Sequence, residues 1–177
     1  LLIAAAIALG TAAAWNTAAF LWGAPVSGNS QIGLLASLIP CFIGCLGFCI
    51  LFNIHGRGMI FCVLGGVLTW LVYSLTVHMG FSDLTAYFWA TLVSAAYSET
   101  MARIRKCPAI GYLVVGIFPL IPGAGVYYAM MYAVHGETAR FAEQGMHTAA
   151  IAGIMAVGIL LGSTVFRMYS DWKNSRK

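Results

Sequence analysis

Long apolar segments recur along the 177-residue chain, and short connections between them carry most of its charged residues. Each segment approaches or exceeds the roughly 20 residues that a helix needs to cross a bilayer. The six segments are Leu1–Gly23, Ile32–Phe52, Met59–Gly80, Leu84–Ala102, Pro108–Val134 and Met146–Phe166. This pattern predicts an all-α integral membrane protein with six transmembrane helices.

The composition agrees with a membrane protein and excludes a soluble domain. Hydrophobic residues make up 61% of the chain and charged residues only 8%, whereas soluble domains carry about 25% charged residues. The net charge of +4 does not indicate a nucleic-acid partner, because the basic residues lie in the connections rather than in one patch. Most of the five cysteines lie in apolar segments, which argues against a disulfide framework.

The basic residues decide the orientation. If all six segments cross, eight of the nine lysines and arginines fall on one side of the membrane. These eight are Arg57, Arg103, Arg105, Lys106, Arg167, Lys173, Arg176 and Lys177. The bias places both termini in the cytoplasm, with residues 169–177 as a basic cytoplasmic tail. In the outer connection His135–Gly145, we expect Glu137–Glu143 to form a short helix on the outer surface.

The fifth segment contains a cluster of helix-breaking residues. Pro119 and Pro122 each lack a backbone N–H and clash with the preceding turn, and Gly123 and Gly125 add conformational freedom. We therefore predict that the fifth helix is broken at Pro119–Gly125. Hydrocarbon cannot satisfy the freed backbone groups, so such a break survives only inside protein or beside a wet cavity.

The break is a candidate substrate-binding site, because discontinuous helices bind substrate in many transporters. Backbone N–H groups at the start of the half-helix Val126–Val134 would attract an anion such as a carboxylate. The candidate residues are Pro119, Pro122, Gly123, Gly125 and Tyr127, the last through its hydroxyl. The alternative is a packing kink whose backbone groups are satisfied by neighbouring Ser and Thr side chains.

Glu99 and Arg103 are candidates for a proton carrier or a gate charge. Glu99 is the acidic residue that lies deepest in a predicted span, and Arg103 follows it by four residues. The alternative is a simple helical ion pair that reaches toward the cytoplasm. His78, His135 and His147 lie at the predicted outer ends of spans, where surface groups are the alternative to a proton relay.

Small residues recur every four positions on several predicted helices, which permits close packing between membrane helices. These residues are Gly33, Ser37, Cys41, Cys45 and Cys49, then Ala86, Ala90, Ser94, Ser98 and Ala102, and finally Gly158 and Gly162. The cysteine row would also suit a soft metal. We expect packing instead, because its helix offers no nearby His, Asp or Glu.

The sequence shows no constellation typical of an enzyme. It contains no evident nucleophile–base pair, phosphate-binding loop, zinc signature or paired carboxylates, and a membrane enzyme needs at least one of these. We therefore expect neither catalytic residues nor a bound cofactor or metal.

Several short motifs follow one another in a specific order. They are Ile50–Ile54 followed by Arg57, Leu64–Val67 leading into Trp70–Tyr73, Glu99–Arg103 with Pro108 behind it, and Gly116–Gly123 followed by Tyr127 and Met130. With this order, the region from about Leu34 to Phe166 resembles the threonine/serine exporter family. In particular, it is similar to the small subunit of the two-component members, which corresponds to the C-terminal half of the single-chain exporters.

The resemblance implies a five-helix exporter-subunit domain at residues 32–168, preceded by an extra transmembrane helix at residues 1–23. It implies secondary export of small carboxylate metabolites, either threonine and serine or a dicarboxylate such as succinate, across a bacterial cytoplasmic (inner) membrane. It also implies a second subunit with its own membrane spans and a hydrophilic N-terminal region.

Two alternatives to a substrate-carrying exporter subunit stay open. The chain could be a structural or regulatory membrane subunit whose partner holds the transport path, which the scarcity of charge inside the spans favours. The other alternative is a channel.

Overall fold

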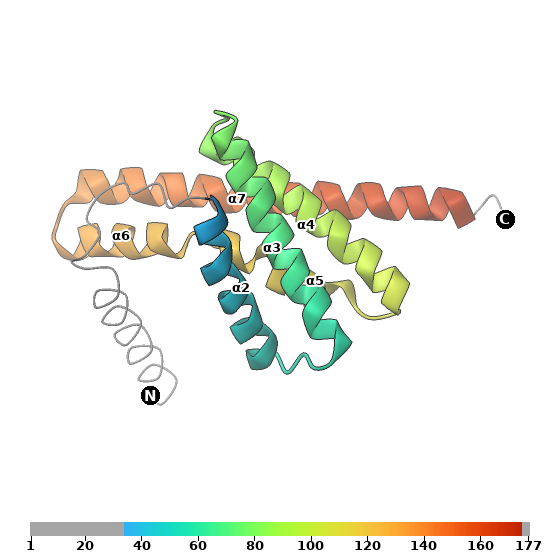
Figure 1. Ribbon diagram of the computed structural model, residues 1–177. Coiled ribbons are helices and arrows are strands. Elements are labelled where there is room, and N and C mark those ends of the chain that lie inside the picture. Colours follow the sequence, from blue (N-terminus) through green and yellow to red (C-terminus); the bar gives the residue numbers. More distant parts are fainter. Residues whose placement is uncertain (1–33, 175–177) are drawn as a thin grey trace. The chain divides into compact units, whose positions relative to one another are not determined.

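The computed structural model describes residues 34–174, and this part of the chain is helical (Figure 1). Its elements are α2 (Leu34–Leu51), α3 (Arg57–His78), α4 (Asp83–Arg105), α5 (Ala109–Ile117), the 3-10 helix η1 (Phe118–Leu120), α6 (Gly123–Val134) and α7 (Thr138–Asn174). No strand occurs among the described residues, which confirms the all-α prediction for them. The predicted first span, Leu1–Gly23, and the end of the predicted tail lie outside them.

The second to fourth predicted spans correspond to α2, α3 and α4, with boundaries set by local turn chemistry. Asn53 and Gly56 adopt positive φ angles of 57° and 68° in the turn before α3. Ser82 begins α4 by accepting a hydrogen bond from the Thr85 N–H at 3.4 Å. Lys106 ends α4 in the left-handed conformation, with its N–H bonded to the Ala102 carbonyl.

The fifth predicted helix is interrupted as its prolines and glycines predict. α5 gives way to η1 at Phe118, and α6 begins at Gly123 after a bend of 54°. Pro119 has no N–H to continue the α-helical ladder, which tightens here into a 3-10 turn. Gly125, which sequence reasoning assigned to the break, lies within the first turn of α6.

The expected helix at Glu137–Glu143 is helical from Thr138 onward, but it is not a short helix of its own. α7 is one helix of 37 residues, and residues 138–143 form its first turns. Only residues 135–137 connect α6 to α7, because Gly136 at a φ of 74° reverses the chain. Glu137 and Glu143 have good helix propensity and no proline follows Thr138, so polarity alone does not end the helix.

Length and composition make α3 and the Thr138–Phe166 part of α7 candidates for crossing a membrane. The bent pair Ala109–Leu120 and Gly123–Val134 is a third candidate, either as one broken span or as a re-entrant loop. α4 is long enough at 23 residues, but its hydroxyl and charged side chains keep it out of this group. The described residues thus support two or three spans, and six crossings with cytoplasmic termini stay predictions.

Close packing of α2, α3 and α5 centres on Gly66 of α3. A Cβ added at Gly66 would meet the Sγ of Cys45 on α2 and would lie 3.4 Å from the Val115 carbonyl oxygen on α5. Cys41 also donates a long hydrogen bond to the Gly66 carbonyl at 3.8 Å. Two members of the cysteine row therefore contact α3, as the packing interpretation expects.

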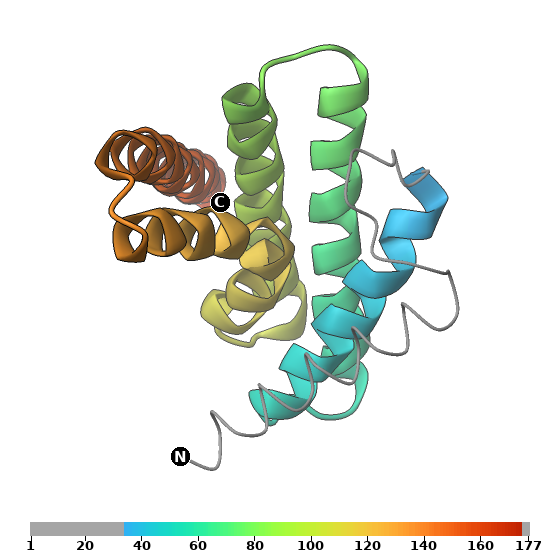
Figure 2. The same cartoon turned by 90° about the vertical axis from the view of Figure 1, so that its left-hand side faces the viewer.

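The glycine pair of α7 packs against α4. A Cβ at Gly158 would meet the Oγ1 of Thr91 and would lie 3.0 Å from the Phe88 carbonyl oxygen. A Cβ at Gly162 would lie 2.8 Å from the Cβ of Ala95. The glycine pair therefore packs closely against α4, but it meets Thr91 and Ala95 rather than the predicted row of small residues, whose member Ser94 lies against Gly116 of α5. α6 runs beside the first half of α7, which Figure 1 shows from the side and Figure 2 shows roughly along the helices.

Candidate functional site

The break between α5 and α6 leaves the start of a helix without a side-chain cap. η1 closes with a hydrogen bond from the Ile121 N–H to the Phe118 carbonyl at 3.2 Å, and the Gly123 N–H donates to the Ile121 carbonyl at 2.7 Å. Pro122 precedes α6, and no side chain bonds to the helix start. Such a start directs backbone N–H groups outward at the positive end of the helix dipole, which attracts anions.

The structure brings four of the predicted site residues together at this break. Pro119 and Pro122 are half-buried, whereas Gly123 is exposed. A Cβ added at Gly123 would meet no atom within 4 Å, so open space adjoins the helix start. Gly125 is packed more tightly, because a Cβ there would lie 2.5 Å from the Oγ1 of Thr148 on α7.

The other predicted residues lie outside the break. Tyr127 follows it in α6 with a 65% exposed side chain, and its ring packs edge-on against Tyr128 at 5.5 Å between centroids. Glu99 and Arg103 lie in the C-terminal quarter of α4. The Arg103 guanidinium stacks over the Phe166 ring of α7 at 4.8 Å, so this side chain takes part in the α4–α7 contact.

A pair of buried hydroxyls lies beside the helix that leads into the break. Ser94 of α4 and Thr69 of α3 are 1% and 0% exposed. A Cβ added at Gly116 of α5 would lie 2.7 Å from the Ser94 Oγ and 3.9 Å from the Thr69 Oγ1. The Thr69 hydroxyl donates to the Gly65 carbonyl at 2.8 Å. The Ser94 Oγ has no hydrogen-bond partner, which costs about 1–3 kcal/mol for a buried polar group.

Neighbouring hydroxyls on α4 do have hydrogen-bond partners, unlike the hydroxyl of Ser94. Ser98 donates to the Ser94 carbonyl at 2.8 Å, and Thr91 donates to the Tyr87 carbonyl at 2.8 Å. Sequence reasoning placed Ser94 in a packing stripe and missed this difference. No sequence signal separates Ser94 from Ser98, since both are serines four residues apart on the same helix.

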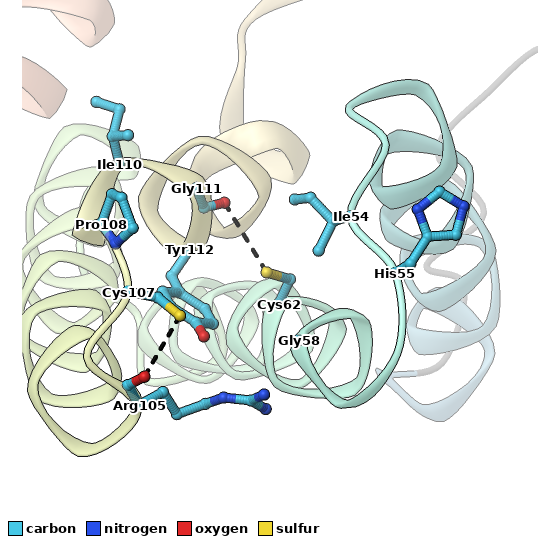
Figure 3. A pocket seen from close by; sticks show the side chains of 10 residues that line it. All are labelled: Ile54, His55, Gly58, Cys62, Arg105, Cys107, Pro108, Ile110, Gly111 and Tyr112. Carbon is cyan, nitrogen blue, oxygen red and sulfur yellow. Dashed lines mark hydrogen bonds between the residues drawn. The ribbon is translucent and has the colours of Figure 1, made fainter.

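A pocket of about 380 Å³ lies where α3 begins, α4 ends and α5 begins (Figure 3). It is lined by Ile54, His55, Gly58, Cys62, Arg105, Cys107, Pro108, Ile110, Gly111 and Tyr112. The Cys62 Sγ approaches the Gly111 carbonyl at 3.9 Å and so connects α3 to α5 across it. Sequence reasoning missed this pocket, because its walls come from three separate stretches of the chain.

Comparisons with known proteins place the chain in a family. No solved structure matches it. An uncharacterized protein of Haemophilus influenzae is 24% identical over 136 residues, which cover 77% of this chain but only 46% of the relative. The chain thus spans about half the length of this curated relative. The model of the family described as "Threonine/Serine exporter, ThrE", a transporter rather than an enzyme family, matches residues 37–165. The chain therefore belongs to the threonine/serine exporter family.

Proposed function

We propose that this chain is a membrane subunit of a secondary exporter of small carboxylate metabolites in a bacterial inner membrane. Threonine and serine are the first candidate substrates, and a dicarboxylate such as succinate is the second. The observation that carries the proposal is the uncapped start of α6 at a 54° bend, beside the open space at Gly123. An anion-attracting helix end within an apolar segment suits a substrate carboxylate.

The buried hydroxyls supply the second part of the proposed site. The Ser94 Oγ lacks a partner and lies beside Gly116, which precedes Pro119 by three residues on the same helix. A substrate group that hydrogen-bonds to Ser94 would remove the cost of this unsatisfied hydroxyl. We propose that the substrate moves between α6 and this hydroxyl during transport. Glu99 and Arg103 remain candidates for a proton carrier or a gate at the far end of α4.

A second chain completes the proposed exporter. The match covers only 46% of the Haemophilus relative, so other segments accompany the matched part in that protein. We propose that a partner with its own membrane spans and a hydrophilic N-terminal region takes their place here. Tyr127 is exposed on this chain and would be accessible to such a partner.

Flux through reconstituted vesicles tests the proposal. The chain is purified with its partner, and uptake of labelled threonine, serine and succinate is measured with and without an imposed proton gradient or membrane potential. Saturable, gradient-dependent uptake of at least one of them is expected. Flux that does not saturate would favour a channel. The scaffold alternative, which the scarce charge within the spans supports, predicts that no substitution at the break changes flux in an intact complex.

Ser94→Ala is expected to reduce transport without destabilising the protein. Removing an unsatisfied buried hydroxyl leaves the free energy of unfolding unchanged or raises it by about 1–3 kcal/mol. The lost substrate hydrogen bond should raise KM about fivefold, as expected for about 1 kcal/mol. Ser98→Ala is the matched control, because that hydroxyl bonds to its own helix. Wild-type flux in Ser94→Ala would remove this hydroxyl from the proposed site.

A further inference from the structure

The pocket of about 380 Å³ (Figure 3) combines the features of an anion-binding site at the opposite end of α5 from the break. α5 has nine residues and is therefore about 13 Å long at 1.5 Å per residue. Pro108, Ile110 and Gly111 at its start line the pocket, and Ile117 at its end adjoins η1. A single short helix thus connects the pocket to the proposed substrate site.

Two helix starts converge on this pocket. α3 begins beside it at Arg57 and α5 begins beside it at Ala109, and neither start has a side-chain cap. Gly58 from the first turn of α3 and Gly111 from the first turn of α5 both line the cavity. The positive ends of both helix dipoles therefore face the same space, which favours an anion.

One permanently charged side chain lines the pocket, and its charge is positive. Arg105 contributes a permanent positive charge, and none of the described residues that line the cavity is acidic. α4 ends here too, but its terminal turn is closed internally, because the N–H of Cys107 donates to the Ala102 carbonyl at 3.1 Å. The negative end of that helix is therefore partly satisfied within the chain.

The guanidinium of Arg105 is held by an aromatic ring. It lies 4.9 Å from the centroid of Phe61, a distance at which cation–π attraction operates. The backbone of Phe61 is fixed in turn by Tyr97, whose hydroxyl donates to the Phe61 carbonyl at 2.8 Å. A positioned guanidinium loses less side-chain entropy when it binds a carboxylate with two parallel hydrogen bonds.

We propose that this pocket captures the carboxylate of a small metabolite, with Arg105 as its main ligand, before the substrate passes along α5 to the break. The inference rests on the proposed export function. The cavity volume lies at the lower end of the range for small-molecule sites, and apolar walls from Ile54 and Ile110 surround the charge. The phosphate of an anionic lipid is the alternative ligand, because it would bind Arg105 by the same anion chemistry as a metabolite carboxylate.

Kinetics of charge variants test the capture site in the reconstituted complex. Arg105→Gln should raise the KM for succinate and threonine about tenfold with little change in kcat, since one charge-assisted contact is lost. Arg105→Lys should recover part of the loss. Lys106→Gln is the matched control, because it removes the adjacent charge, which does not line the pocket. If the wild-type complex transports and Arg105→Gln leaves KM unchanged, the capture site is overturned and the export proposal stands.

Two further measurements separate a metabolite from a lipid as the ligand and cover the case in which Arg105→Gln does not fold. In vesicles of phosphatidylcholine alone, the effect of Arg105→Gln should persist, and its disappearance there would assign the pocket to anionic lipid instead. Cys107, the exposed cysteine of the pocket, also reports occupancy in the wild-type chain. Succinate or threonine should slow maleimide labelling of Cys107, and labelling that neither compound changes would overturn the proposal even if Arg105→Gln fails to fold. If succinate or threonine protects Cys107 from maleimide in a complex that transports neither compound, the export proposal is contradicted and the binding site stands.

Discussion

Gly162→Ala lowers the thermal stability of the protein, whereas Gly153→Ala on the same helix does not. This is the largest structural effect that we expect from one methyl group. A Cβ at Gly162 would lie 2.8 Å from the Ala95 Cβ and 2.9 Å from the Leu92 carbonyl oxygen, while one at Gly153 would meet no atom within 4 Å. The backbone of α4 cannot turn aside as a flexible side chain would, so the two helices must separate. Overpacking of this kind costs about 1–3 kcal/mol.

Unfolding of the purified variants in detergent checks this expectation, with wild type and Gly153→Ala measured alongside. Gly158→Ala should act in the same direction, because its Cβ would lie 3.0 Å from the Phe88 carbonyl oxygen. Equal melting temperatures for Gly162→Ala and Gly153→Ala would show that α4 and α7 do not touch as described. The result bears on function too, because Ser94 and the end of α4 are positioned by this contact.

Gly123→Leu should abolish most of the flux while leaving the complex assembled. The added side chain meets no atom within 4 Å at its Cβ, so the fold of this chain is not strained there. It would instead occupy the open space in front of the uncapped start of α6. A carboxylate that loses two hydrogen bonds of about 1.5 kcal/mol each binds about a hundredfold more weakly.

Pro122→Leu approaches the same site by a different route. It restores an N–H at the break and removes the clash that prevents a continuous helix, so the amide groups at the start of α6 would be drawn into the helical ladder. Flux should fall for both variants, with co-purification of the partner as the check on assembly. Gly153→Leu, a substitution at another open position, serves as the control. Undiminished flux in both would favour the scaffold alternative.

The break and the small-residue faces were predictable from sequence because each depends on local properties. Pro119 and Pro122 cannot take part in an α-helical ladder wherever the chain places them. Gly158 and Gly162 share a helix face through their spacing alone. The sequence did not predict the continuity of α7, because the polar segment after Glu137 resembles a loop in hydropathy although its residues form helix readily.

The amino-acid sequence by itself determined that this is a helical membrane protein, that its fifth apolar segment is interrupted, and which helix faces are narrow enough for close contact. Only the tertiary structure decided which faces meet, why Ser94 lacks a partner while Ser98 has one, and that the starts of α3 and α5 converge on Arg105. The physical reason is the distance along the chain over which each property is set: backbone geometry and apolar periodicity depend on residues only a few positions apart. A buried hydroxyl or a pocket, in contrast, is defined by atoms that lie far apart along the chain.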